Sequence, residues 1–221
     1  MKFEEELNEE LKFDEKNRKL SKAEEKRLAK YKEVEKEMLE KGYEKHEFTV
    51  SLVKANMYAF FDGLPFIITF FLIYYFVGNK FTMGNGIVAG IIFFLNFSVA
   101  TIVHEGLHGL GYLPSVKNPS KEIEFGFIKE MLTPYCVCNA LLKKHQYLIG
   151  LLMPFFVLGV CVSILGIVFE SLTLLISGSF QIMSAGGDLL VAYLTIWNRS
   201  KKKDVLYHDH PTQCGVVMFD K

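Results

Sequence analysis

The sequence predicts a mainly α-helical fold: a polytopic membrane bundle of about four transmembrane helices, with a small cytoplasmic β-hairpin and a charged N-terminal helix. Half of the 221 residues are hydrophobic, yet they are unevenly distributed. Residues 1–55 are dominated by Lys and Glu, whereas most of 57–198 is apolar with little charge. We therefore expect a charged cytoplasmic helical segment at 1–55, joined to a membrane-embedded domain at 56–221 that ends in a short cytoplasmic tail.

The charge balance also excludes a class of partner. The formal net charge is zero, so there is no basic surplus to neutralise phosphates, and we expect no nucleic-acid binding. Met1 leads into a run of charged residues rather than an apolar region, so no cleavable signal peptide is predicted and membrane insertion relies on the internal apolar segments.

The charged segment at 3–45 is predicted to form a helix or a helix pair. Leu28, Tyr31 and Met38 give a thin apolar stripe, while Glu and Lys crowd the other faces. Gly42 is a plausible stop. We expect a solvated helix lying near the membrane surface, with a coiled-coil partner site as the alternative.

Four apolar stretches follow, each near the ~20 residues that cross a bilayer core. They run from 57 to 77, from 86 to 112, from 147 to 169, and from 172 or 179 to 197. The fourth is interrupted at 177–179 and at 184–187 by small residues. Such breaks are tolerated where the freed backbone lines a cavity or faces protein.

Lys and Arg set the orientation of these spans. They gather before the first span, between the second and third, and after the fourth, whereas the other two loops offer only Lys80 between them. This asymmetry predicts a multi-pass protein of the cell membrane with both termini and the central loop in the cytoplasm.

The central loop has its own pattern. Residues 122–127 alternate and 135–138 read as a second strand, which predicts a short hairpin whose free edge could pair with an extended peptide. The tail at 207–215, with His208, His210 and Cys214, invites a second metal site. A turn followed by a strand at 216–219, docking on the hairpin, is the favoured interpretation.

The most informative motif lies at the end of the second apolar stretch. His104 and His108 are spaced i and i+4, so both imidazoles can reach one metal ion from a single helix face. Glu105 lies beside that ion, placed as the general base that takes a proton from a metal-activated water. The run from 86 to 103 holds no charged residue, and ionisable groups at membrane depth are usually functional. The pattern predicts a zinc (Zn²⁺) site.

A catalytic zinc usually takes three protein ligands. Besides Glu105, the acids in or next to the four apolar stretches are Asp62, Glu170 and Asp188. Asp188 is the favoured third ligand, because it follows two glycines in a helix that could break around the metal. Its alternative role is to cap the second half-helix. Asp62 lies near the start of the first span, and Glu170 falls at the outer end of the third.

The chain resembles the DUF3267 group of zincin peptidases, small bacterial membrane proteins similar to the site-2 protease class. The resemblance spans most of 57–219 and rests on HEGLHG at 104–109, TPYCVC at 133–138, MPF at 153–155, SAGGD at 184–188 and DHPTQCG at 209–215. It implies His104 and His108 as metal ligands, Glu105 as the catalytic residue and Asp188 as a third ligand. One departure concerns Asp188: site-2 proteases carry their distal aspartate before a glycine, whereas here the glycines precede it.

Together these features predict a membrane-embedded zinc metalloprotease that hydrolyses a peptide bond near the cytoplasmic membrane face. Its partners would be the lipid bilayer and a peptide or membrane-protein substrate. The alternative is a non-catalytic metal-binding membrane regulator or scaffold that retains the same helix.

Overall fold

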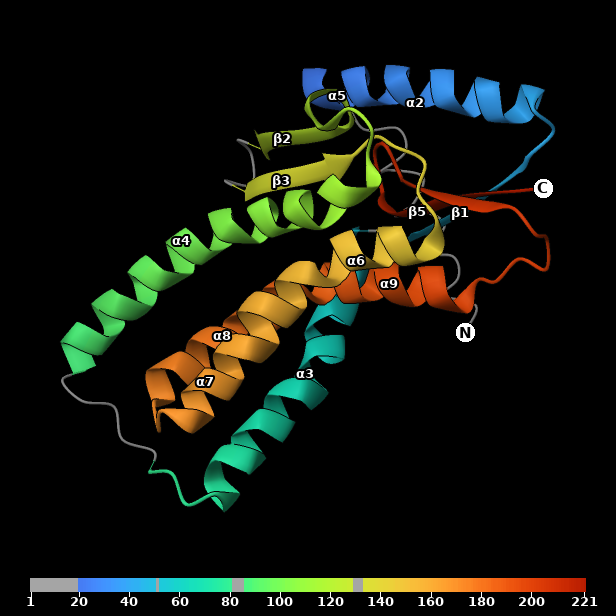
Figure 1. The fold of residues 1–221 in the computed structure, drawn as a ribbon. Helices are drawn as coiled ribbons and strands as arrows, with labels where there is room; N and C mark the ends of the chain where they lie inside the picture. Colours follow the sequence, from blue (N-terminus) through green and yellow to red (C-terminus); the bar gives the residue numbers. More distant parts are fainter. Residues whose placement is uncertain (1–19, 51, 81–85, 129–132) are drawn as a thin grey trace.

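Long helices form one elongated body, and two small sheets and a charged helix cover one end of it (Figure 1). The computed structural model describes residues 20–50, 52–80, 86–128 and 133–221. The described elements are α2 (Lys22–Glu40), β1 (Glu44–Val50), α3 (Leu52–Phe76), α4 (Gly86–Tyr112), α5 (Pro119–Glu122), β2 (Ile123–Ile128), β3 (Thr133–Cys138), α6 (Lys144–Pro154), α7 (Val162–Val168), α8 (Leu172–Ser184), α9 (Gly186–Trp197), β4 (Val205–Asp209) and β5 (Cys214–Asp220).

Helix α2 confirms the charged helix and its stripe. Ser21 caps it by accepting from the Glu24 amide, and the chain turns at Gly42 with a φ of 82°. The stripe residues Tyr31 and Met38 are buried, but they pack on the C-terminal strand β5. The expectation of a fully solvated helix is therefore wrong for this face. The part of the predicted segment before residue 20 lies outside the described residues.

The tail forms a sheet with the N-terminal segment. Its strand order is β1-β5-β4, all antiparallel, with Phe48 opposite Val216 and Leu206 opposite Phe219. A strand over 216–219 is thus confirmed within β5. Docking of that strand on the hairpin is wrong, because its two edges are already occupied by β1 and β4. Strand β1 was not predicted, since the charged helical segment was expected to extend to residue 45 and no strand was assigned after it.

The predicted hairpin is confirmed as the antiparallel pair β2–β3, with Phe125 opposite Cys136. It lies against α4 (Figure 1). Gly109 leaves room for the ring of Phe125, since a Cβ there would lie 2.4 Å from the Cζ atom of that ring.

The apolar stretches form helices with nearly the predicted bounds. Helices α6 and α7 are joined by a π-helical stretch, Phe155–Cys161, into one continuous helix. Helices α8 and α9 are bent by 49° at Ala185, so the break predicted at 184–187 is confirmed. At 177–179 the helix continues unbroken. Gly178 serves close packing there, since a Cβ would lie 2.6 Å from the backbone nitrogen of Ser163.

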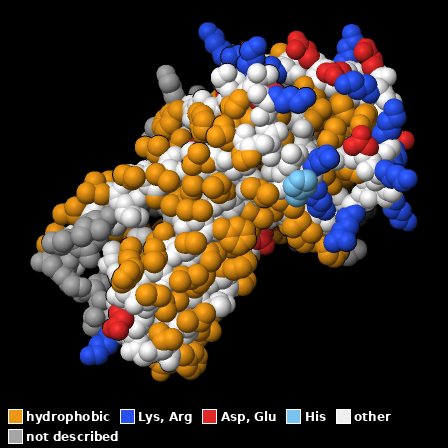
Figure 2. Space-filling view, viewed as in Figure 1, with side chains coloured by type: hydrophobic (Ala, Val, Ile, Leu, Met, Phe, Trp, Pro, Cys, Tyr) orange, Lys and Arg blue, Asp and Glu red, His pale blue; other side chains and the backbone are white. Residues whose placement is uncertain are grey.

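One helix in the described part of the chain, Lys144–Val168, is long and apolar enough to cross a membrane. The bent pair α8–α9 passes the same test as one unit, which gives up to two candidate spans by length and composition. Large apolar side chains also stay exposed along α3 and α4, among them Phe61 and Phe94. Figure 2 shows hydrophobic side chains over the long helical body and charged ones gathered mainly at the end that carries α2 and the sheets.

Candidate metal centre

Helix α4 carries the histidine motif near its C-terminal end. One helical turn separates His104 from His108, so both rings project from the same face, and their centroids lie 5.0 Å apart. They are only 5% and 6% exposed. Imidazoles so deeply buried need polar partners, and the structure supplies them from α9 and α6.

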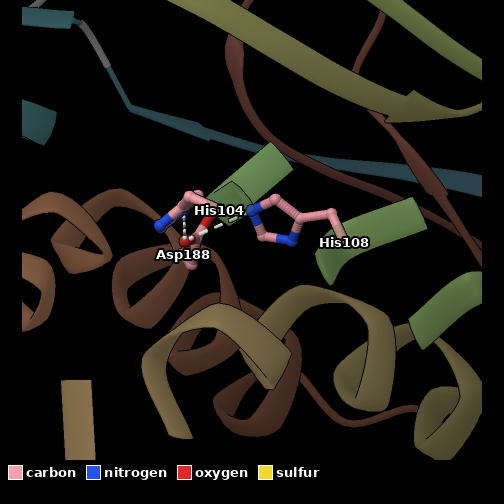
Figure 3. Close-up of side chains that lie close together, drawn as sticks. All are labelled: His104, His108 and Asp188. Atoms are coloured by element: carbon pink, nitrogen blue, oxygen red, sulfur yellow. Dashed lines mark hydrogen bonds and ion pairs between the residues drawn. The ribbon is translucent and has the colours of Figure 1, made fainter. Parts of the chain in front are cut away.

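Asp188 comes from the first turn of α9, just after the bend, and points at both histidines (Figure 3). Its Oδ2 lies 3.2 Å from Nε2 of His104 and 3.5 Å from Nε2 of His108. The start of α9 has no side-chain cap, so the alternative capping role is not the one that Asp188 takes in this structure. Asp62 and Glu170 are not part of the group.

The three side chains fit a zinc ion. Their donor atoms all lie within 4.8 Å of one another. Two imidazole nitrogens and one carboxylate oxygen form a usual zinc donor set, and atoms bound to one tetrahedral zinc at about 2.0–2.1 Å lie about 3.3–3.4 Å apart. The measured 3.2 and 3.5 Å bracket that separation. This group could therefore hold a metal ion.

The ring of His108 is oriented by α6. Its Nδ1–H donates to the carbonyl oxygen of Gly150 at 3.0 Å, which leaves Nε2 facing Asp188. The two helices can meet so closely because Gly111 faces Gly150, where a Cβ on Gly111 would lie 2.7 Å from the Gly150 Cα. For His104, Nδ1 is buried with no partner among the described residues.

Glu105 is oriented by the hairpin, since its carboxylate accepts a hydrogen bond from the backbone of Cys136. Backbone N–H groups alternate in direction along a strand. Asn139 donates to Glu122 on the β2 side, so the N–H groups of Cys138 and Cys136 point to the opposite edge of β3. That edge faces the metal centre, and Glu105 accepts from one of its N–H groups, that of Cys136.

The other N–H group on this edge of β3, that of Cys138, also donates to a carboxylate. Cys138 donates to Oδ2 of Asp209 at 3.1 Å, and the hydroxyl of Tyr147 donates to Oδ1 of the same residue at 2.7 Å. The sequence pointed to none of these supporting contacts. The TPYCVC and DHPTQCG motifs marked the segments, but a backbone donor leaves no residue-type signal.

Among the described residues, the histidines of the tail are not part of a metal-binding group. His208 packs on Tyr31, and His210 accepts at Nδ1 from the Gln213 amide at 2.9 Å. A second acidic and histidine group in the described part of the chain joins Glu44, His46 and Asp220. There, Lys202 pairs with both carboxylates, at 2.7 Å from Glu44 and 3.0 Å from Asp220, so an ammonium group already lies between them.

The fold and this centre define a mainly helical protein with a zincin-type pair of histidines and an acidic third group. Residues 97–203 match the DUF3267 family, described as "Putative zincin peptidase". The match covers just under half of the chain, and the predicted resemblance is confirmed over these residues. The rest of the predicted range, with DHPTQCG at 209–215, lies outside the match. No curated protein and no solved structure matches the chain significantly.

Proposed function

We propose that this protein is a membrane-embedded zinc metalloprotease that hydrolyses a peptide bond near the cytoplasmic face of the cell membrane. The observation that carries the proposal is the convergence of His104, His108 and Asp188 at separations of 3.2 and 3.5 Å. The family description supports the same reaction class. Asp188 is the proposed third ligand, and Glu105 is the proposed general base.

Each residue has a separate role. His104, His108 and Asp188 bind the metal, and the Gly150 carbonyl keeps His108 in the tautomer that can bind. Zinc in such a site acts as a Lewis acid that polarises a peptide carbonyl and lowers the pKa of a water molecule. Glu105 takes the proton from the attacking water and returns it to the leaving amine. The backbone of Cys136 holds the carboxylate of Glu105 during both transfers.

The proposed membrane arrangement uses four spans: α3, α4, the continuous helix Lys144–Val168, and α8–α9 together. Two features support it. Exposed apolar side chains continue along α3 and α4, and the Lys and Arg residues lie mainly at the opposite end, around α2 and the sheets (Figure 2). Both termini and the hairpin would then lie in the cytoplasm, and the metal centre would lie near that face.

A cavity of about 480 Å³ beside α4 supports access for a peptide segment. It is lined by α4, the π-helical stretch, α7 and α8, through Leu95, Asn96, Val99, Ala100, Val103, Leu158, Val162, Ser177 and Gln181. Val103 directly precedes His104, so the cavity borders the turn that carries the metal centre. The buried Oε1 of Gln181 has no partner among the described residues, and a peptide offers the hydrogen-bond donors that it lacks.

The test is the zinc content of the full-length protein purified in detergent. Wild type and Glu105→Gln should each hold about one zinc per chain, whereas His108→Ala should hold none, because it removes a metal-binding nitrogen. A double variant, His104→Ala with His108→Ala, that still held full zinc would rule out the site.

Catalysis is tested in cells. Losing a general base commonly costs a factor of ~10²–10⁴, so Glu105→Gln should accumulate an uncleaved membrane substrate while remaining folded and metal-loaded. If Glu105→Gln cells matched wild type in every membrane-protein fragment while a deletion had a phenotype, a metal-binding scaffold would replace the protease.

A further inference from the structure

Asp209 is a partly buried carboxylate at the end of β4, outside the segment that matches the family. It uses one oxygen for the Tyr147 hydroxyl, at 2.7 Å, and the other for the Cys138 amide, at 3.1 Å. A carboxylate removed from water costs free energy unless such bonds replace its hydration. Both oxygens of Asp209 therefore accept hydrogen bonds, one from α6 and one from β3.

Each of its donors belongs to an element that orients a residue of the metal centre. Tyr147 lies on α6, three residues before Gly150, whose carbonyl oxygen holds His108. Cys138 lies on β3, two residues after Cys136, whose backbone holds Glu105. The Asp209 side chain thus connects α6, which orients His108, with β3, which orients Glu105.

We propose that Asp209 is a positioning residue of the metal centre, which it serves by fixing α6 and β3 relative to each other. The inference rests on the proposed function, because it assigns Asp209 a role only if His108 binds metal. The proposal also gives the tail sheet a role in the site. Strand β4 places a carboxylate between α6 and β3, and neither of these elements has a carboxylate there.

The tail does not need Asp209 in order to stay folded onto the body. Tyr207, Val216 and Met218 share one buried cluster with Tyr112 and Tyr147. Apolar burial of this kind stabilises the docked tail, and the Asp209 carboxylate adds nothing to the apolar area that is buried. Its two hydrogen bonds are therefore separable from the packing, so a substitution can remove them while the cluster remains.

The experiment compares three variants of the full-length protein by zinc affinity, measured by competition with a chelator. Asp209→Asn leaves only one acceptor oxygen for two donors. Tyr147→Phe removes the α6 bond alone, and Tyr207→Phe is the matched control. Tyr207 stacks on Tyr147 with a centroid distance of 6.2 Å, but its hydroxyl is not one of the two donors to Asp209. We expect zinc affinity to fall about 10–100-fold in the first two variants and to stay at the wild-type value in the third.

A second readout needs no metal. Burial raises the pKa of the Cys138 thiol to about 12, and its side chain is buried, so alkylation at this position should be slow in the wild type. In the metal-free protein, Asp209→Asn should accelerate labelling of Cys138, followed by mass spectrometry, because it frees β3 and removes a charge that raises the pKa of this thiol. Tyr147→Phe should not, because it leaves the Cys138 bond intact.

Equal losses of zinc affinity in Tyr147→Phe and Tyr207→Phe would overturn the inference, since that result indicates general loosening of the aromatic stack. So would wild-type zinc affinity in Asp209→Asn. If Asp209→Asn did not fold, the comparison of the two tyrosine variants would still decide the α6 contact. Failure of the wild type itself to bind zinc would instead overturn the proposed function.

Discussion

The crossing of α4 and α6 gives a quantitative prediction through Gly111. An alanine there would place its Cβ 2.7 Å from the Gly150 Cα and 3.2 Å from the Ile149 carbonyl oxygen. Ordinary contact begins at 3.4 Å, so the α6 backbone must retreat by about 0.7 Å (3.4 minus 2.7). The same backbone carries the oxygen that holds His108 at 3.0 Å. If the whole shift fell on that bond, its length would reach about 3.7 Å, beyond hydrogen-bond range.

Gly111→Ala should therefore weaken zinc binding about 10–100-fold, the usual cost of losing a partner that orients a metal-binding histidine. Overpacking should also cost about 1–3 kcal/mol of stability. The assay is chelator competition together with thermal unfolding of the metal-free protein. The control is Gly106→Ala on the same helix, where a Cβ meets nothing within 4 Å, so zinc affinity should stay at the wild-type value. Wild-type zinc affinity in Gly111→Ala would refute the reasoning, because it would mean that the helix crossing does not position His108.

Three further predictions concern other parts of the molecule. Asp188→Asn should weaken zinc binding by more than the ~10–100-fold typical of a neighbouring residue, and an unchanged affinity would exclude Asp188 as a metal ligand. Reporter fusions after Asn79 and after Lys202 should report opposite sides of the membrane, and signals from one side would contradict the four-span arrangement. Burial lowers the pKa of His210, so the unfolded chain binds more protons and stability should fall as the pH drops below the ordinary value of 6.5. Thermal unfolding at pH about 7.5 and about 5.5 should show a smaller decrease for His210→Asn, and an equal decrease in both proteins would exclude His210 as the cause.

Patterns local in the chain were predictable. The i, i+4 spacing places His104 and His108 on one helix face whatever surrounds them, and the alternation at 122–127 requires only that one face of a strand be covered. Continuous apolar runs likewise predicted helices with nearly the observed bounds. The small residues at 184–187 indicated a break, because glycine weakens a helix that has no partner to hold it.

What escaped prediction depends on contacts between distant segments. Strand β1 begins with exposed charged residues, which do not indicate a strand. It becomes a strand because it pairs with an edge of β5, which follows it by more than 160 residues. The same holds for the bond between Gly150 and His108, since every residue carries a carbonyl and nothing in the sequence marks the one that is used. Asp188 was favoured on local grounds, and the 49° bend between α8 and α9 accompanies its approach to the histidines.

The metal centre illustrates why the motif alone does not define the site. Helix α4 fixes the relative positions of His104, Glu105 and His108, but free rotation about the side-chain bonds leaves the rings and the carboxylate undirected. Direction comes from two backbone groups, the Gly150 carbonyl on α6 and the Cys136 amide on β3. Most side-chain substitutions leave these backbone groups in place, so their positions depend on what holds the two elements. These supports are the small residues at the α4–α6 crossing and the carboxylate of Asp209 between α6 and β3. Substitutions at these remote positions should therefore alter metal binding before they unfold the protein.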